Sequence, residues 1–107
     1  MNNKVLLEAA DKFGTPLYIY DSNMIKSQYN RLKQSFKDVK NLQINYAVKA
    51  LSNISILKYM INLGSGIDAV SIQEVKLALK AGVNPKKILY TPNGVSIEEI
   101  KEVSELG

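Results

Sequence analysis

A lysine closes an apolar run near the middle of the chain and is the residue best suited to chemistry. Lys49 ends a run that begins at Ile44. Side chains alternate between the faces of a strand, so a strand here would place Lys49 on the same face as Ala47. The bulky Tyr46 and Val48 would occupy the other face. At the carboxyl end of a barrel strand, a partly desolvated amine could lose its proton and attack a carbonyl. Lys49 is therefore a candidate for forming a Schiff base, and a solvated surface lysine is the alternative.

The composition is that of a folded protein of about one small domain. The 107 residues are 46% hydrophobic and 22% charged, with a net charge of +4. These values are typical of globular rather than disordered chains. Acidic residues are interspersed with the basic ones, so we expect no basic stripe of the kind that binds nucleic acid.

Several classes of site are excluded by residue type. The chain contains no cysteine and no histidine, which removes disulfides, thiolate metal sites and imidazole acid–base chemistry. No apolar run approaches the roughly 18 residues of a membrane span. The first residues lack the apolar core of a secretory signal. We therefore expect a cytoplasmic protein that binds neither membranes nor nucleic acid.

Residues 1–42 are expected to form an N-terminal segment of a strand and helices. A short helix is expected around Val5–Phe13, followed by a strand at Leu17–Tyr20. A second helix should begin after a cap at Asp21 or Ser22. Its core-facing stripe has helical spacing and consists of Ile25, Tyr29, Leu32 and Phe36.

Residues 43–107 repeat a strand-helix unit three times. The strands are predicted at Gln43–Val48, Ile67–Val70 and Lys87–Thr91. The helices are predicted at Ile54–Leu63, Ile72–Ala81 and Ile97–Leu106. Repeated crossovers of this kind imply a parallel sheet.

The helix ends carry their own signals. Ser71 with Glu74, and Ser96 with Glu99, have the spacing of capping boxes. In that motif the serine accepts a bond from a free backbone N–H, and the glutamate reaches back to the cap. Gly82 follows a predicted helix, as the left-handed C-terminal cap requires.

Two architectures fit this order, an open doubly wound sheet and a (β/α)8 barrel. No glycine-rich nucleotide motif follows any strand, which weighs against a nucleotide-binding open sheet. A barrel needs eight units and about 250 residues. We therefore expect an α/β fold that is the N-terminal, incomplete portion of a barrel, with residues 1–42 leading into it and residues 43–107 forming its first three βα units.

Four collinear stretches carry a family resemblance. They are Phe13-Gly14-Thr15-Pro16-Leu17-Tyr18-Ile19-Tyr20-Asp21, Tyr46-Ala47-Val48-Lys49-Ala50, Gly66-Ile67-Asp68-Ala69-Val70-Ser71 and Ala78-Leu79-Lys80-Ala81-Gly82. The chain resembles the N-terminal part of the diaminopimelate decarboxylase family, within the alanine-racemase-like (fold type III) pyridoxal-phosphate enzymes. The resemblance implies pyridoxal 5'-phosphate as cofactor.

The resemblance also implies roles for three residues. Lys49 matches the lysine that holds the cofactor covalently, Asp68 matches an acidic residue on the next strand, and Ala47 matches a small residue below the cofactor ring. Neighbouring strands lie about 4.8 Å apart, so Asp68 could approach the Lys49 amine. The alternative for Asp68 is a strand-end acid that binds local backbone N–H groups.

The sequence also departs from the family pattern. Leu51 intervenes where many relatives have asparagine after Lys-Ala, and Ile72-Gln73 replaces a glycine pair. The lost glycines put in doubt a close backbone approach to a ligand there. Thr91-Pro92-Asn93-Gly94 is a turn at the active face, and its polar groups could touch a substrate.

The implied reaction converts meso-diaminopimelate to L-lysine and CO2, in lysine biosynthesis. Ornithine or arginine decarboxylase and carboxynorspermidine decarboxylase are alternatives, because the residues that read the substrate lie further along the family's chain. A non-catalytic regulatory protein on the same scaffold and a small flavodoxin-like domain are further alternatives.

Several parts of the family's site have no counterpart in these residues. They include the glycine loop that binds the phosphate, the acid that faces the pyridine nitrogen, and the C-terminal β-domain. The resemblance implies a homodimer for the full-length protein and an amino-acid substrate. We expect the isolated chain to be inactive and to retain the cofactor weakly.

Overall fold

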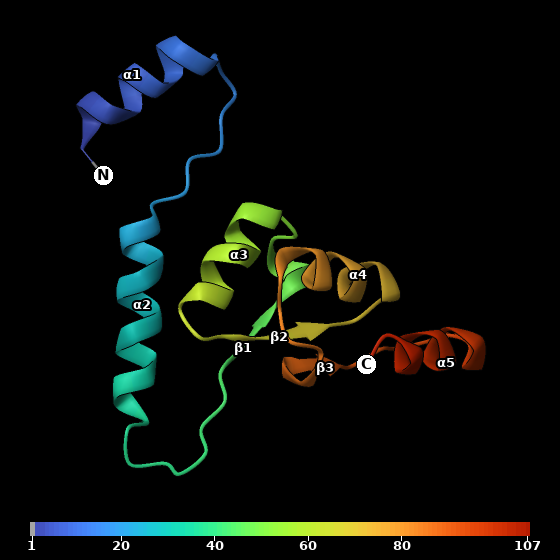
Figure 1. Cartoon of the computed structure of the whole chain (residues 1–107). Coiled ribbons are helices and arrows are strands. Elements are labelled where there is room, and N and C mark those ends of the chain that lie inside the picture. The colour runs from blue at the N-terminus through green and yellow to red at the C-terminus, as the bar shows by residue number, and fades with distance from the viewer. Residues whose placement is uncertain (1) are drawn as a thin grey trace.

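The computed structural model describes residues 2–107, and a three-stranded parallel sheet forms its centre (Figure 1). The strands β1 (Asn45–Ala47), β2 (Gly66–Ala69) and β3 (Ile88–Tyr90) lie in the order β1-β2-β3. Each is followed by a helix, and these are α3 (Ile54–Asn62), α4 (Ile72–Ala81) and α5 (Ile97–Glu105). The predicted parallel βα repeat is confirmed.

The predicted bounds hold better for helices than for strands. Helix α4 has the predicted bounds, and α3 and α5 each end one residue earlier than expected. The strand β2 begins and ends one residue earlier than predicted. The strands β1 and β3 are shorter than predicted, and a 3-10 turn adjoins each of them. The turn η1 (Val48–Ala50) follows β1 directly, and η2 (Pro85–Lys87) precedes β3.

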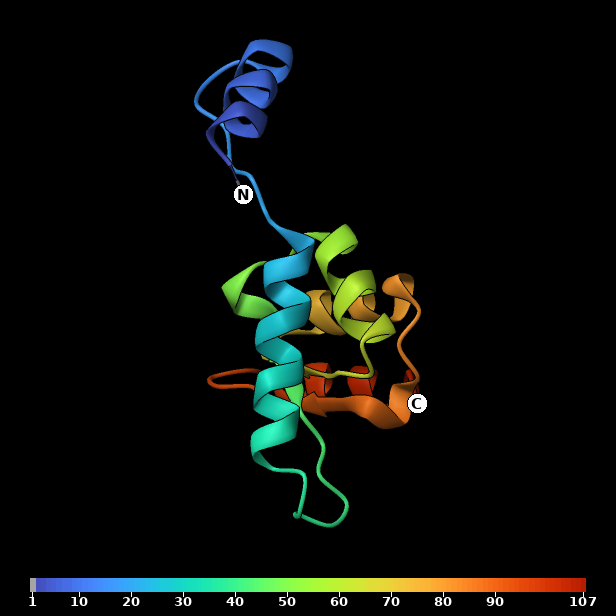
Figure 2. The same cartoon turned by 90° about the vertical axis from the view of Figure 1, so that its left-hand side faces the viewer.

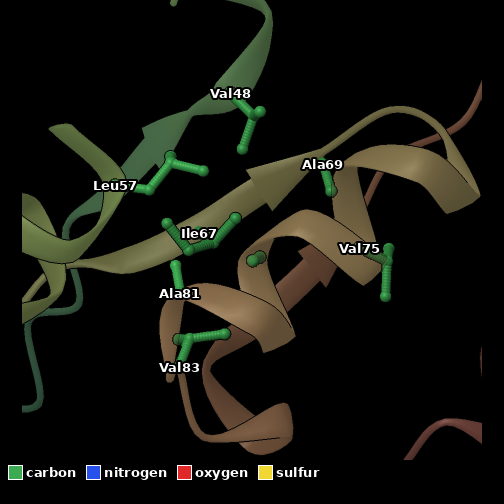
Figure 3. Packing of buried hydrophobic residues seen from close by; sticks show 8 residues of the cluster. Val48, Leu57, Ile67, Ala69, Val75, Ala81 and Val83 are labelled. Carbon is green, nitrogen blue, oxygen red and sulfur yellow. The ribbon is translucent and has the colours of Figure 1, made fainter. Parts of the chain in front are cut away.

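One face of the sheet carries the core. Tyr46, Ile67 and Ile88 are partners in the strand register and therefore point to the same side. Helices α3 and α4 cover this side, where Leu57 of α3 lies beside Ile67 (Figure 3). The apolar side chains with the lowest exposure are Val48, Leu57, Ile67, Ala69, Ala78 and Val75. This packing fixes the orientation of all three strands.

The opposite face carries small or polar side chains on β1 and β2 and a leucine on β3. Ala47, Asp68 and Leu89 form one register row on it, and Leu89 is 51% exposed. At Gly66 an added Cβ would overlap the side-chain amides of Asn45 and Gln43. This face therefore uses glycine and alanine where neighbouring side chains lie across it.

The N-terminal helix stands apart from the sheet. No residue of α1 (Asn3–Phe13) is buried, and both views show it separated from the other helices (Figures 1 and 2). The radius of gyration is 16.6 Å, against about 13 Å for a compact domain of this length. The expected helix at Val5–Phe13 is confirmed within these longer bounds.

The predicted strand at Leu17–Tyr20 is wrong. All four side chains are exposed, and the segment pairs with no other strand among residues 2–107. A segment rich in aromatic and β-branched residues becomes a strand only when a partner takes up its backbone hydrogen bonds. The residue types of Leu17–Tyr20 could not indicate that no partner strand lies beside this segment among the described residues.

Helix α2 (Ser22–Ser35) begins as predicted but buries less than predicted. Asp21 caps it, with Oδ1 accepting from the N–H groups of Asn23 and Met24 at 2.9 and 3.2 Å. Of the expected stripe only Tyr29 is buried, while Leu32 and Phe36 are 45% and 47% exposed. The stripe prediction is thus only partly correct. Helix α2 lies at the β1 edge of the sheet, and its C-terminal end extends past the strand (Figure 1).

Candidate active site

Lys49 lies immediately after β1, in the turn η1 rather than in the strand. The chain leaves the strand at Ala47, and the Leu51 N–H closes the turn on the Val48 carbonyl at 3.0 Å. Val48 is fully buried and anchors the turn. The prediction that Lys49 shares a strand face with Ala47 by alternation is therefore wrong, although its place at the carboxyl end of the strand is confirmed.

The Lys49 side chain is exposed. The expectation of a partly desolvated amine is not met in this structure. β1 is an edge strand of a three-stranded sheet, so no neighbouring strand on its outer side covers the amine within residues 2–107. The lysine is accessible to a ligand, and the described residues do not enclose it.

The segment after Lys49 is held by side-chain hydrogen bonds. The Tyr46 hydroxyl donates to the Leu51 carbonyl at 3.1 Å. Asn53 then caps α3, with Oδ1 accepting from the Ser55 and Ile56 N–H groups at 2.9 and 3.3 Å. Burial of the phenol is the main reason that the pKa of Tyr46 is raised, so this donor stays protonated at neutral pH. The turn carrying Lys49 is thus fixed at both ends.

Asp68 lies on the neighbouring strand and faces the same side as Ala47, its register partner on β1. The Asp68 side chain is half-buried, and its Oδ1 accepts a hydrogen bond from Thr91 Oγ1 at 2.5 Å. No ion pair or hydrogen bond joins Asp68 to Lys49 among residues 2–107. The structure therefore brings Ala47, Asp68 and Thr91 together at the carboxyl edge, and Lys49 follows the neighbouring strand without a hydrogen bond or ion pair to them within residues 2–107.

Thr91 continues β3 and contacts the candidate site. Its N–H donates to the Ala69 carbonyl at 2.9 Å, which aligns the end of β3 with the end of β2. The sequence placed Thr91 in a turn with possible substrate contact, and it did not predict the bond to Asp68. A hydroxyl at a strand end, one strand from an acid, is the signal that could have found this bond.

The two predicted capping boxes are only half formed. Ser71 and Ser96 accept from the N–H groups of Glu74 and Glu99 at 3.3 and 3.2 Å, as expected. The carboxylates do not return to the caps. Glu74 Oε2 instead accepts from the Val70 N–H at 2.7 Å. The reciprocal part of the prediction is wrong, because Glu74 and Glu99 accept hydrogen bonds from other donors.

Glu99 links three elements below the candidate site. Its Oε1 accepts from the Ile72 N–H at 3.0 Å and from the Tyr90 hydroxyl at 2.8 Å. Burial of the phenol, together with this bond and the charge of Glu99, raises the pKa of Tyr90 to about 12. One carboxylate thus connects α5, the start of α4 and the end of β3, next to Thr91.

Neither a metal site nor a membrane span is found in the described part of the chain. Residues 2–107 contain no cluster of three metal-ligating acidic, histidine or cysteine side chains. Within the same range, no helix combines the length and apolar character needed to cross a bilayer.

Sequence comparison identifies relatives along most of the chain. A family model described as the pyridoxal binding domain of pyridoxal-dependent decarboxylases matches residues 22–107. The diaminopimelate decarboxylase of Campylobacter jejuni is 49% identical over 94 residues, which cover 88% of this chain and 23% of that protein. The diaminopimelate decarboxylase of Methanothermobacter thermautotrophicus is 41% identical over 102 residues, covering 94% of this chain and 24% of that protein. The chain thus spans about a quarter of the length of these curated relatives.

Solved structures show the same fold. Diaminopimelate decarboxylase from Helicobacter pylori, complexed with L-lysine, has a TM-score of 0.84 and 41% identity, covering 98% of this chain and 26% of that one. Lysine/ornithine decarboxylase from Vibrio vulnificus has a TM-score of 0.87 at 24% identity, covering 97% of this chain and 28% of that one. The latter similarity concerns the fold alone. The predicted fold class, a portion of the barrel of these enzymes, is confirmed.

Proposed function

The chain belongs to the pyridoxal-dependent decarboxylase family, and we propose that it carries the cofactor-attaching lysine of a diaminopimelate decarboxylase. The reaction would release CO2 from meso-diaminopimelate and yield L-lysine. The observation that carries this proposal is the identity of 41–49% to diaminopimelate decarboxylases, extending over Lys49 and Asp68. The bound L-lysine of the Helicobacter pylori structure fits the same product.

The residues at the carboxyl edge fit pyridoxal phosphate. Lys49 offers an exposed amine, and Ala47 leaves space on the face that it shares with Asp68. Thr91 engages only one Asp68 oxygen, which leaves the other oxygen able to face a cation. We infer that Lys49 would hold the cofactor covalently, that Ala47 would lie against its ring, and that Asp68 would lie beside the lysine.

Each of these residues has a distinct part in the proposed chemistry. When bound, pyridoxal phosphate supplies an electron sink for the carbanion that remains after CO2 leaves. The Lys49 amine would attach the cofactor and accept a proton when the substrate amine displaces it. The Asp68 carboxylate, held by Thr91, would stabilise the resulting ammonium. Thr91 is a positioning residue in this scheme, because it acts through Asp68.

We propose that residues 1–42 form the segment leading into the barrel and that residues 43–107 form its first three βα units. The exposed amine of Lys49 and the open edge of β1 support this division. The remaining walls of the site, the phosphate-binding loop and the homodimer partner would be supplied outside these residues. The isolated chain is then inactive and retains the cofactor weakly.

The attachment site can be tested by reductive trapping. The chain, expressed within its complete reading frame, is incubated with pyridoxal phosphate, reduced with borohydride and mapped by peptide mass spectrometry. We expect the label on the peptide containing Lys49 and its loss in Lys49→Ala. Lys58→Ala is the matched control, because Lys58 is an exposed lysine of the following helix. A label on any other lysine in the parent protein contradicts the assignment.

The substrate is tested separately by CO2 release. We expect release from meso-diaminopimelate and little from ornithine, arginine or carboxynorspermidine. A preference for one of these amines would replace the substrate while leaving Lys49 in its role. Cofactor attachment without CO2 release from any of the four would favour a non-catalytic relative on the same scaffold.

A further inference from the structure

A hollow lined by lysines lies at the edge of the sheet opposite the candidate active site. Its volume is about 370 Å³, and it is bounded by the end of α2, the segment after it and the starts of the strands. Gln43 and Ile44 precede β1, Gly64 precedes β2, and Lys87 precedes β3. Lys49 and Thr91 follow their strands instead. A ligand in this hollow would therefore not overlap with one at the carboxyl edge.

Three lysines from separate segments line the hollow, and no acidic residue does. Lys33 belongs to α2, Lys37 to the segment after α2, and Lys87 to η2. None of the three amines forms an ion pair or a side-chain hydrogen bond within residues 2–107. A hollow lined by charges of one sign raises the local concentration of oppositely charged ligands.

The net charge of the chain is concentrated around this hollow. Residues 33–41 together with residues 86–87 contain five lysines and one aspartate, an excess of four positive charges. This excess equals the net charge of the whole chain, +4, so the remaining residues are balanced. The partial negative charge at a helix C-terminus is confined to its last turn, so it accounts for Lys33 but not for Lys37 or Lys87.

The rest of the lining suits a polar ligand of limited size. The amide groups of Asn41 and Gln43 supply hydrogen-bond donors, and the rings of Phe36 and Tyr29 form apolar walls. Asn41 has a φ of 57°, the left-handed conformation in which asparagine is enriched, and so it turns the chain back towards β1. A volume of about 370 Å³ lies in the range of sites for small molecules.

We propose that this hollow is a binding site for a small, soluble, phosphate-bearing anion. Lysines bind phosphate as point charges, and three of them match an anion carrying two or more negative charges. The site is independent of the proposed decarboxylase function, because it uses none of the residues at the carboxyl edge. The amino-terminal edge of a barrel serves stability rather than chemistry, so the bound anion would act as a stabilising effector.

Binding can be measured on the 107-residue chain with inorganic pyrophosphate as the probe. Calorimetry and amide chemical shifts are recorded at constant ionic strength, set with sodium chloride. We expect saturable binding, with shifts confined to residues around 33–44 and 87, and a higher melting temperature at saturation. Each of Lys33→Gln, Lys37→Gln and Lys87→Gln should weaken binding by about three- to fivefold, the scale of a partly exposed ion pair.

A matched variant and a second probe make the proposal refutable. Lys58→Gln removes an exposed lysine of α3 that does not line the hollow, and it should leave the affinity unchanged. A loss of affinity in Lys58→Gln equal to that in Lys87→Gln would mean unspecific charge attraction and overturn the proposal. Absence of binding above the chloride background, or binding only to vesicles containing anionic lipid, would also overturn it. Circular dichroism of each variant checks that the fold is retained.

Discussion

A methyl group added at Gly66 has no space in this fold. The Cβ would overlap the side-chain amides of Asn45 and Gln43, and it would lie 2.8 Å from the Lys87 backbone carbonyl. The two amides are linked to each other at 3.1 Å and can move aside together. The carbonyl cannot, because it belongs to the backbone just before β3. Gly66→Ala must therefore shift β3 relative to β2.

The expected cost follows from overpacking. Extra methylene groups in a well-packed region cost about 1–3 kcal/mol, and breaking the amide pair adds less because it is exposed. For a domain of this size 1 kcal/mol changes the melting temperature by about 4–8 °C. We expect Gly66→Ala to lower the melting temperature of the chain by roughly 5–20 °C, measured by circular dichroism or calorimetry.

A double-mutant cycle separates the two contributions. Gly66→Ala is also made in a chain carrying Gln43→Ala and Asn45→Ala, and that chain without the Gly66 substitution is the control. The cost of Gly66→Ala should fall in this background but should not vanish, because the Lys87 carbonyl remains. A melting temperature for Gly66→Ala equal to that of the parent would refute the argument from steric overlap. An identical cost in both backgrounds would show that the side-chain amides of Gln43 and Asn45 do not contribute to the overlap.

Three further outcomes are expected. Burial, the hydrogen bond to Glu99 and the charge of Glu99 raise the pKa of Tyr90 from 10.0 to about 12. Tyr90 therefore stabilises the fold fully below pH 10, and this stabilisation is lost as the pH rises towards 12. Tyr90→Phe should flatten the dependence of stability on pH between 10 and 12, and an unchanged dependence would contradict the role of Tyr90. Leu57→Ala, at a fully buried position, should cost about 2–5 kcal/mol in urea unfolding, and a cost below about 1 kcal/mol would place Leu57 outside the core. Thr91→Val should lose the bond to Asp68 and about 0.5–1.5 kcal/mol, while Thr91→Ser should retain most of that stability. A loss in Thr91→Ser as large as that in Thr91→Val would contradict the assignment of the effect to the hydrogen bond.

The sequence predicted most accurately those elements whose first and last residues are set by local capping residues. Helix α4 has the predicted bounds because Ser71 caps its start and Gly82, at a φ of 95°, adopts the left-handed conformation at its end. The parallel sheet could be predicted because three strand-helix repeats leave few other topologies.

Other features depend on contacts that lie far apart in the sequence. Leu17–Tyr20 has the pattern of a strand, but strand formation requires a partner, and none pairs with it among the described residues. The site was predictable in its location and less so in its detail. Lys49 lies at the end of β1 as expected. However, the strand ends at Ala47 and a 3-10 turn begins at Val48, so strand alternation does not determine the direction of the Lys49 side chain. Neither the bond from Thr91 to Asp68 nor the bond from the Ile72 N–H to Glu99 could be predicted locally, because each joins separate βα units.

The parallel βα topology favours acidic side chains at the carboxyl edge of the sheet and basic side chains at the amino edge. Lys49 is an exception to this distribution. In parallel βα units the helix N-termini lie at the carboxyl edge of the sheet, where free N–H groups favour carboxylates. Glu74 and Glu99, in the first turns of α4 and α5, accept such bonds. Lys33 and Lys80 lie in the last turns of α2 and α4, towards the other edge. Lys49 places a positive charge at the carboxyl edge, against this trend and without an ion pair among residues 2–107. Residues that depart from the local electrostatic preference of a fold are concentrated at functional sites, so the position of Lys49 favours a chemical role over a stabilising one.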